Sequence, residues 1–349
     1  MAHARFESLG VHLPDTVTST EELLRRMHRP PRFDLEELTG IKNRRTHDTR
    51  PDSYEDSFVL ATKAASRCLH RSRYRADELE VLICASVTRL KDGNRFHFEP
   101  SFASMLARAL GADSAIHFDV SNACAGMLTG VLVLERMIAS GAVRNGMVVS
   151  GEQITPIAET AAREIRTARD PQVASLTVGD SGAAVILDRS GDPMDRIHHV
   201  ELATFADQAQ SCIAMPSEHS QGFAMFTDHA HPQSPERLDR WPAFYDAVLE
   251  RSGTTFEHER FDHVVHHQVG TRVIDAMDRA GEAFFATPMP ASLRTVEEHG
   301  NTSSTSHFVV LHEHLKTGVL RRGAKVLLVT AGSGGVTGCL SATLSSLEA

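Results

Sequence analysis

The sequence lacks the segments that mark a membrane or secreted protein. It contains no run of about 18 apolar residues, so no membrane span is expected. Its first ten residues, MAHARFESLG, have no apolar core of the kind found in signal peptides. We therefore expect a cytoplasmic protein with no membrane span.

Patterns that form metal sites and disulfides are missing as well. The five cysteines have no CxxC spacing, and the 20 histidines include no HExxH motif. We therefore expect reduced cysteines and no metal site. An excess of basic charge is also absent, because 45 acidic residues against 36 basic ones give a net charge of −9. This balance argues against nucleic-acid binding.

The most informative stretch is Ala115–Ile138, AIHFDVSNACAGMLTGVLVLERMI. A run of strand length, Ala115–Val120, leads into small and polar residues. Met127–Ile138 follows and is too long for a strand, so we expect a buried helix. Cys124 then lies where that helix begins, and free backbone N–H groups and the helix dipole there favour a thiolate. An inert core cysteine is the alternative, because free cysteine is often buried.

Two later stretches favour a nucleophilic Cys124. Phe261–Arg272, FDHVVHHQVGTR, predicts a strand that ends in a His-His-Gln turn. Glu298–Ser306, EHGNTSSTS, places an asparagine in a Gly-Asn turn before another helix. One Cys, one His and one Asn at strand ends and helix starts form an arrangement for acyl transfer on a thiol.

The pattern of elements predicts an α/β protein. Strands and helices alternate twice along the chain, which indicates a layered fold with mostly parallel sheets. We expect two halves, residues 1–190 with the cysteine and residues 195–349 with the histidine and asparagine. The segment Ser211–Arg240 is rich in His, Pro, Ser and Phe and has no clear element. An insertion at the acyl pocket or its entrance and a simple surface loop are both compatible with it.

The chain resembles the thiolase-fold condensing enzymes of the β-ketoacyl-ACP synthase III family. The segments TGIKNRR, FDVSNACAGM, HHQ, EHGNTSSTS and AGSGGVTG occur in the family's order along nearly the whole chain. The resemblance implies two similar halves stacked as five layers (αβαβα) in a homodimer. It also implies an acyltransferase that forms a C–C bond by Claisen condensation through an acyl-cysteine. Its substrates would be CoA or acyl-carrier-protein thioesters, with no cofactor, in fatty-acid, specialised-lipid or polyketide synthesis.

The resemblance also implies a role for each residue of the triad. Cys124 would carry the acyl group, and His267 would donate a hydrogen bond to the oxygen that gains negative charge. His267 matches the family's position better than His266, because Gln268 follows it directly. Asn301 would be the second donor, stabilising the enolate of the extender unit.

Further binding residues follow from the same resemblance. The backbone N–H of Cys124 and the turn that contains Ser333 and Gly334 would form an oxyanion hole, where glycine lets the chain approach the thioester closely. Arg272 matches an arginine at the family's pantetheine-tunnel entrance. An ordinary surface arginine is the alternative.

Glu99 departs from the family's usual pattern. Ordinary members have an apolar residue here that lines the partner's acyl pocket across the dimer. The pattern Glu-Pro-Ser-x-Ala-Ser resembles the condensing enzymes that begin long-chain olefin synthesis, which need a base to remove an α-proton. A carboxylate in an apolar tunnel has a raised pKa and suits that task. The alternative is a charge at the N-terminus of the helix expected at Phe102–Leu110.

A second departure concerns the thioester carrier. The family's CoA-using members hold the adenine with a Trp and an Arg, and these positions are Asp34 and Leu38 here. An acyl-carrier protein is therefore favoured over CoA as the donor of the acyl group. Two other functions stay open: an acyltransferase that acts on an alcohol or amine, and a non-catalytic partner subunit. Relatives of the first kind tend to lose the asparagine, and the second would lack the nucleophile.

Overall fold

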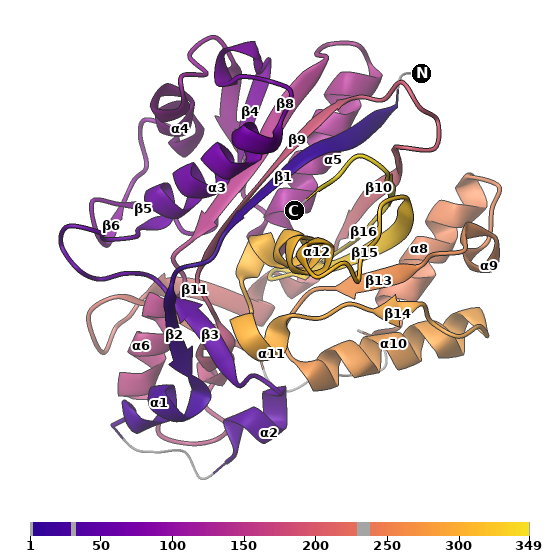
Figure 1. Cartoon of the computed structure of the whole chain (residues 1–349). Helices are drawn as coiled ribbons and strands as arrows, with labels where there is room; N and C mark the ends of the chain where they lie inside the picture. Colours follow the sequence, from indigo (N-terminus) through magenta and orange to yellow (C-terminus); the bar gives the residue numbers. More distant parts are fainter. Residues whose placement is uncertain (1–2, 29–32, 229–237, 349) are drawn as a thin grey trace.

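The computed structural model describes residues 3–28, 33–228 and 238–348. In this part of the chain the fold is built on two five-stranded sheets, with strand orders β1-β9-β8-β4-β7 and β10-β16-β15-β13-β14 (Figure 1). The first sheet consists of β1 (Ala4–His12), β9 (Ser181–Arg189), β8 (Asn145–Glu152), β4 (Val81–Cys84) and β7 (Ile116–Asp119). The second consists of β10 (Ile197–Thr204), β16 (Val336–Leu344), β15 (Ala324–Gly332), β13 (His263–His266) and β14 (Ala291–Ser292).

The two sheets share one pattern of strand directions. In each, the first two neighbouring pairs are antiparallel and the last two are parallel. The expectation of mostly parallel sheets is therefore wrong. Parallel neighbours need a crossover that covers the sheet, whereas antiparallel neighbours do not. A short turn joins β15 to β16. The helix between β8 and β9, Thr155–Glu164, packs against β12 (Phe223–Thr227).

The helices form three layers around the two sheets, as Figure 1 shows. The outer helices of the first sheet are α3 (Ser57–Arg71) and α4 (Phe102–Leu110), and those of the second are α8 (Arg240–Arg251) and α10 (Thr271–Phe285). Between the sheets lie α5 (Gly126–Ala139) and α12 (Ser306–Lys316), which contact strands of both sheets. This confirms the thiolase-type αβαβα arrangement of two similar halves.

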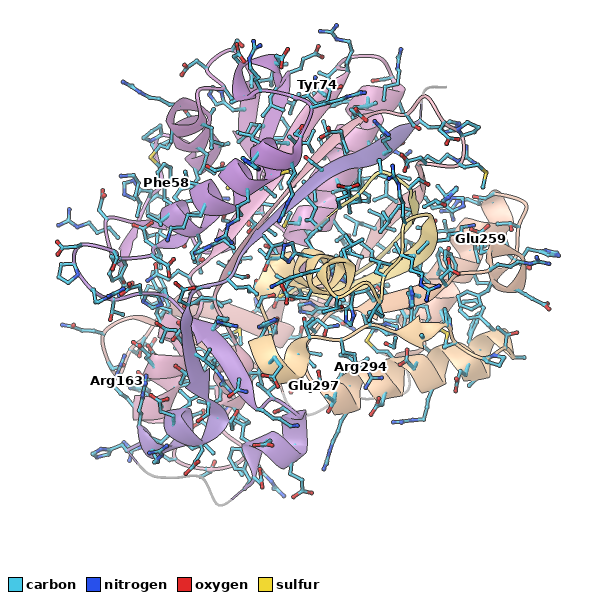
Figure 2. The ribbon with its side chains drawn as sticks, in the orientation of Figure 1. Phe58, Tyr74, Arg163, Glu259, Arg294 and Glu297 are labelled. Carbon is cyan, nitrogen blue, oxygen red and sulfur yellow. The ribbon has the colours of Figure 1, made fainter. Side chains whose placement is uncertain are left out.

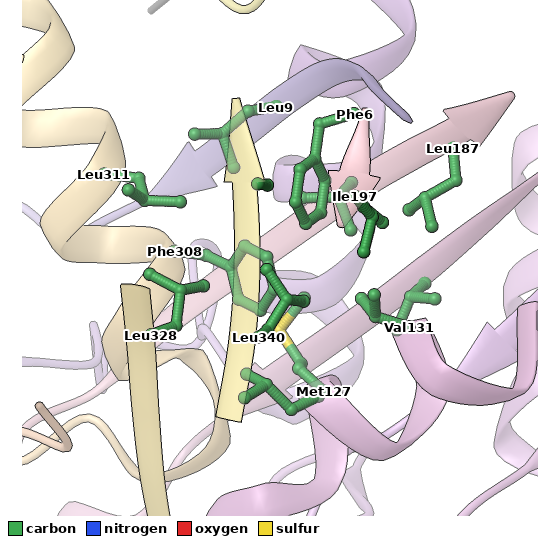
Figure 3. Packing of buried hydrophobic residues seen from close by; sticks show 14 of the residues in the cluster. Phe6, Leu9, Met127, Val131, Leu187, Ile197, Phe308, Leu311, Leu328 and Leu340 are labelled. Atoms are coloured by element: carbon green, nitrogen blue, oxygen red, sulfur yellow. The ribbon is translucent and has the colours of Figure 1, made fainter. Parts of the chain in front are cut away.

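The largest core lies between the two sheets (Figure 3). Phe6 of β1 packs edge-on against Phe308 of α12, with 6.2 Å between the ring centroids. Met127 of α5 and Leu340 of β16 belong to the same cluster and are fully buried. Burying one such side chain contributes about 1.5–3 kcal/mol. The core therefore fixes α5 and α12, whose first turns carry the candidate site.

Smaller helices and strands complete the fold around the two sheets. They are β2 (Thr16–Ser19), α1 (Thr20–Arg25), α2 (Leu35–Thr39), β3 (Asn43–Thr46), β5 (Leu90–Lys91), β6 (Arg95–Phe96), α6 (Thr155–Glu164), β11 (Cys212–Pro216), β12 (Phe223–Thr227), α9 (Phe256–Glu259) and α11 (Val296–His299). The unassigned segment Ser211–Arg240 contains the hairpin β11–β12, while its residues 229–237 lie outside the described residues. No helix in the described ranges is long and apolar enough to span a bilayer.

Candidate active site

A cavity of about 420 Å³ lies beside Cys124. Most of its wall is apolar, as expected of a site that takes a hydrocarbon chain. The apolar wall includes Val87, Leu90, Ile154, Ile157, Phe223 and Met225. The hairpin β11–β12 supplies part of this wall, so the described part of the segment Ser211–Arg240 belongs to the pocket and is not a simple surface loop.

Cys124 lies in a short 3₁₀ turn, Ala123–Ala125, directly before α5. Ala123 has φ +45°, a conformation that costs free energy for a residue with a side chain and that recurs at functional sites. Gly126 is required here, because a Cβ on it would lie 2.8 Å from the carbonyl oxygen of Ala85. The small residues around the cysteine therefore let the start of α5 sit against the end of β4.

The second half repeats this turn. Ser303–Thr305 is a 3₁₀ turn directly before α12, and Ser303 has φ +55°. The two turns contact each other, with 3.8 Å between Cys124 Sγ and Ser303 Oγ. The N-termini of α5 and α12 thus meet at the thiol, and both carry the positive end of a helix dipole.

Burial of the thiol opposes the effect of the two helix dipoles. Burial raises the pKa of Cys124 to about 12, the hydrogen bond with Ser303 opposes this rise, and the Glu152 carboxyl adds to it. Desolvation of the charged sulfur thus opposes the thiolate that the helix N-terminus was expected to favour. The protonation state of the thiol is determined by the balance of these two effects.

His267 directly follows β13 and is buried, with 3 % of its surface exposed. Its ring lies 6.0 Å from that of His307, which belongs to α12, and the two planes are 24° apart. Burial, together with the nearby His307, lowers the pKa of His267 to about 3, so the ring is neutral. His267 Nδ1 is buried and has no hydrogen-bond partner among the described residues.

His266 has a different environment. Its Nε2 lies 2.8 Å from Asp278 Oδ1, and its ring packs edge-on against Trp241. Arg294, labelled in Figure 2, holds the other oxygen of Asp278 at 3.1 Å. His266 Nε2 is therefore engaged by Asp278, whereas neither ring nitrogen of the neighbouring His267 has a partner among the described residues.

Asn301 is held by its backbone. Its N–H donates to Thr177 at 2.8 Å, and its carbonyl accepts from Gly179 at 3.0 Å. The side-chain oxygen accepts the N–H of Ser303 at 3.0 Å. The Nδ2 group has no hydrogen bond to any residue in the described ranges. It remains available to donate to a ligand.

Two of the remaining predicted residues lie at the cavity and one does not. Ser333 and Gly334, in the turn between β15 and β16, line the cavity together with Cys124. Arg272 does not line it. Its side chain is 52 % exposed and pairs with Glu37 of α2 at 3.2 Å. Arg272 therefore lies on the surface, and its role at a tunnel entrance stays a prediction.

Glu99 fits neither of its expected environments in the single chain. It is exposed and does not line the cavity, so the carboxylate is not in an apolar tunnel here. The N-terminus of α4 is capped by Ser101, and Asp119 accepts the N–H groups of Phe102 and Ala103 at 3.0 and 2.8 Å. Asp119 and Ser101 thus already accept the free N–H groups at this terminus, and the role of Glu99 stays a prediction.

Sequence reasoning missed Glu152, a fully buried carboxyl at the end of β8. It accepts hydrogen bonds from the N–H of Val87 at 3.0 Å and from the hydroxyls of Ser150 and Ser304 at 2.8 and 2.6 Å. Burial raises the pKa of Glu152, and these bonds act in the opposite direction. The carboxyl ties the cavity wall at Val87 to the turn that faces Cys124. A charged residue directly after an apolar strand was the available signal.

Comparison with known proteins supports one family. Residues 118–206 match the family described as 3-oxoacyl-[acyl-carrier-protein (ACP)] synthase III, and residues 249–344 match its C-terminal part. The chain is 26% identical over 349 residues to β-ketoacyl-[acyl-carrier-protein] synthase III of Lactococcus lactis subsp. cremoris, covering 96% of this chain and 97% of that protein. It is 28% identical over 345 residues to the same enzyme of Alkalilimnicola ehrlichii, with coverage of 96% and 97%.

Solved structures show the same fold. Xanthomonas campestris OleA with bound lauric acid and lauroyl-CoA superimposes with a TM-score of 0.80 at 23% identity, covering 98% of this chain and 99% of that one. The 3-oxoacyl-[acyl-carrier-protein] synthase III of Aquifex aeolicus gives 0.77 at 23% identity, with coverage of 97% and 99%. The matched segments carry Cys124 and both later motifs, and the two halves stack as in these structures. The chain belongs to the 3-oxoacyl-ACP synthase III family of thiolase-fold condensing enzymes.

Proposed function

We propose that this chain joins two acyl groups by Claisen condensation and that Cys124 carries the first of them as a thioester. One observation carries the proposal. The cavity includes the thiol of Cys124, while His267 and Asn301 keep polar atoms that no described residue uses. An imidazole nitrogen and a carboxamide nitrogen without a protein partner can each form a hydrogen bond with a ligand.

The chemistry follows from these groups. The sulfur of Cys124 attacks the thioester carbonyl, the neutral ring of His267 takes the thiol proton, and the carrier thiol leaves with that proton. The enolate of a second acyl thioester then attacks the acyl carbon and displaces the thiolate of Cys124, which regains its proton from the base that removed the α-proton. Asn301 Nδ2 donates to the enolate oxygen, a donor that stabilises developing charge. A neutral imidazole has a free lone pair for this proton, and its lowered pKa means that it gives the proton up readily to the leaving carrier thiol.

Intact-mass measurement tests the first step. The protein incubated with lauroyl-CoA, or with lauroyl-acyl-carrier protein, should gain one lauroyl group, located on Cys124 by peptide mapping. Cys124→Ala should gain none, and Cys212→Ala, which changes another cavity cysteine, should gain it as the wild type does. An adduct that persists in Cys124→Ala would show that the nucleophile is misassigned.

We further propose that the enzyme works as a homodimer in which Glu99 of one subunit is the base in the partner's cavity. Glu99 directly follows the exposed Phe98, and the nearby Phe96 lines the cavity. The segment thus runs from the cavity wall to the exposed surface, which supports a contact of Glu99 with another subunit. The Glu99 carboxylate has no hydrogen bond or ion pair within the described ranges. In this reaction Glu99 removes the α-proton of the second acyl thioester, so that no carbon dioxide needs to leave.

Complementation between subunits tests that assignment. Glu99→Gln should still form acyl-Cys124 but should release no condensed product. In a mixed dimer of one Glu99→Gln subunit and one Cys124→Ala subunit, a cavity contains both an intact Cys124 and an intact Glu99 only if Glu99 reaches into the partner's cavity. Such a dimer should therefore regain activity. A monomer in sedimentation analysis, or full-rate condensation by Glu99→Gln, would contradict the proposal.

The same assays separate the alternative function and the carrier. An enzyme that acylates alcohols or amines would transfer the lauroyl group to such acceptors and form no C–C bond. The free Nδ2 of Asn301 favours condensation, because that donor is needed for the enolate. Asp34 caps α2 and Leu38 is exposed, so neither supplies the aromatic or guanidinium contact for adenine. We therefore expect an acyl-carrier protein as donor, in specialised lipid or polyketide synthesis.

A further inference from the structure

The apolar wall of the cavity contains one buried amide. Gln153 follows the last residue of β8, is fully buried and lines the cavity. Its Nε2 donates to Tyr54 Oη at 2.9 Å and to Asn94 Oδ1 at 3.1 Å. Its Oε1 is buried and has no partner among the described residues.

Hydrogen bonds to Tyr54 and Asn94 fix the position of this amide. Tyr54 Oη donates to Asn94 Oδ1 at 3.2 Å and lies 3.5 Å from His47 Nε2. The other ring nitrogen of His47 is 2.7 Å from Asp180, which is fully buried. The backbone N–H of Gln153 donates to Thr88 at 3.1 Å. These contacts hold Nε2 against two acceptors, so the unpaired atom is the carbonyl oxygen.

An unpaired oxygen in this place has a cost that a plain hydrocarbon chain would not relieve. Leaving a buried acceptor without a donor costs free energy, and an alkyl chain offers no donor. A hydroxyl group on the chain would supply the missing donor. The neighbouring wall residues Ile154, Ile157 and Met225 would contact the rest of the chain.

We propose that the cavity selects acyl chains that carry a hydroxyl group, and that Gln153 Oε1 accepts the hydrogen bond from it. The inference rests on the proposed function, since the acyl chain enters on Cys124. It names a substrate class: hydroxylated acyl thioesters. A site built to bond a substrate hydroxyl discriminates strongly against the analogue that lacks it, because the protein group is then left unpaired.

The test compares acylation rates of Cys124 with matched donors. Octanoyl-CoA and dodecanoyl-CoA are each paired with their 3-hydroxy and ω-hydroxy forms, and the adduct is followed by intact mass. Wild-type protein should acylate with at least one hydroxylated form about tenfold faster than with the unsubstituted chain. Gln153→Leu, which has a similar size and no acceptor, should bring this ratio to about one or reverse it.

Two controls keep the result interpretable. Met225→Leu changes the apolar wall and should leave the hydroxyl preference intact. Tyr54→Phe removes the acceptor that orients the amide and should reduce the preference without abolishing acylation. All donors share the pantetheine arm, so a bond between Gln153 and a pantetheine amide would slow every donor equally and leave the ratio unchanged.

The outcomes separate this inference from the proposed function. If no donor acylates Cys124, the proposed function fails. If all donors acylate it and wild type prefers the unsubstituted chains, or if Gln153→Leu keeps the wild-type ratio, the proposed function stands and the hydroxyl preference is refuted. In that case a water molecule or the carrier arm pairs with Gln153.

Discussion

Cys124 should react slowly with alkylating reagents in the free protein, although it lines a cavity and faces two helix N-termini. Burial raises the pKa of its thiol from 9.0 to about 12. Only the thiolate is the nucleophile, so the reactive fraction determines the rate. A shift of three units lowers that fraction about a thousandfold, equivalent to about 4 kcal/mol.

The assay is carbamidomethylation by iodoacetamide, resolved by peptide mapping so that each cysteine gives its own rate constant. N-acetylcysteine provides the rate of a free thiol. Near pH 7.5 Cys124 should react about a thousandfold more slowly than this reference, and its rate should climb about tenfold per pH unit with no plateau below about pH 10. Cys68, whose pKa is also raised to about 12 but which is fully buried, should react more slowly still.

The neutral state of His267 provides a second test of the slow reaction expected of Cys124. A neutral ring adds no charge that would stabilise a thiolate, so His267→Ala should leave the alkylation rate of Cys124 nearly unchanged while it slows acylation by a thioester. An alkylation rate at or above that of the free thiol, or a plateau below about pH 8, would refute the reasoning. It would mean that the helix N-termini do stabilise a resting thiolate, as the sequence suggested.

Three further predictions concern stability. Gly126→Ala should destabilise the protein by about 1–3 kcal/mol in urea unfolding, because its Cβ would lie 2.8 Å from the Ala85 carbonyl; Gly111→Ala, where a Cβ meets open space at positive φ, separates strain from crowding. Glu152→Ala should cost about 3–5 kcal/mol by leaving buried donors unpaired, and Glu152→Gln should cost less. His267 has a pKa lowered to about 3, so the unfolded chain binds its proton first as pH falls below about 6.5. Stability should therefore fall by about 2 kcal/mol between pH 6.5 and pH 4.5 from this ring, and His267→Phe should flatten that dependence; an unchanged slope would show that the ring is not buried as a neutral base.

Much of the local structure could be predicted from the sequence. The helix expected at Phe102–Leu110 has those bounds as α4, and the strand expected at Ala115–Val120 is β7, Ile116–Asp119. Both carry local signals, an amphipathic run after a capping serine and a short run that ends in small and polar residues. The directions of the strands were harder to predict from the sequence, because packing between segments far apart in the chain determines which strands are neighbours in a sheet.

The site shows the same division. The sequence by itself determined which residue types stand at strand ends and helix starts, so Cys124, His267 and Asn301 could be named from motifs and their order. Only the tertiary structure decided their state, because burial by distant segments raises the pKa of the thiol and lowers that of the imidazole. It also decided that Gln153 lines the pocket and that Glu152 bonds the turn facing Cys124, since a single strand does not reveal which surfaces will close around its end. Desolvation and pairing depend on what folding brings together, and no short stretch of sequence contains that information.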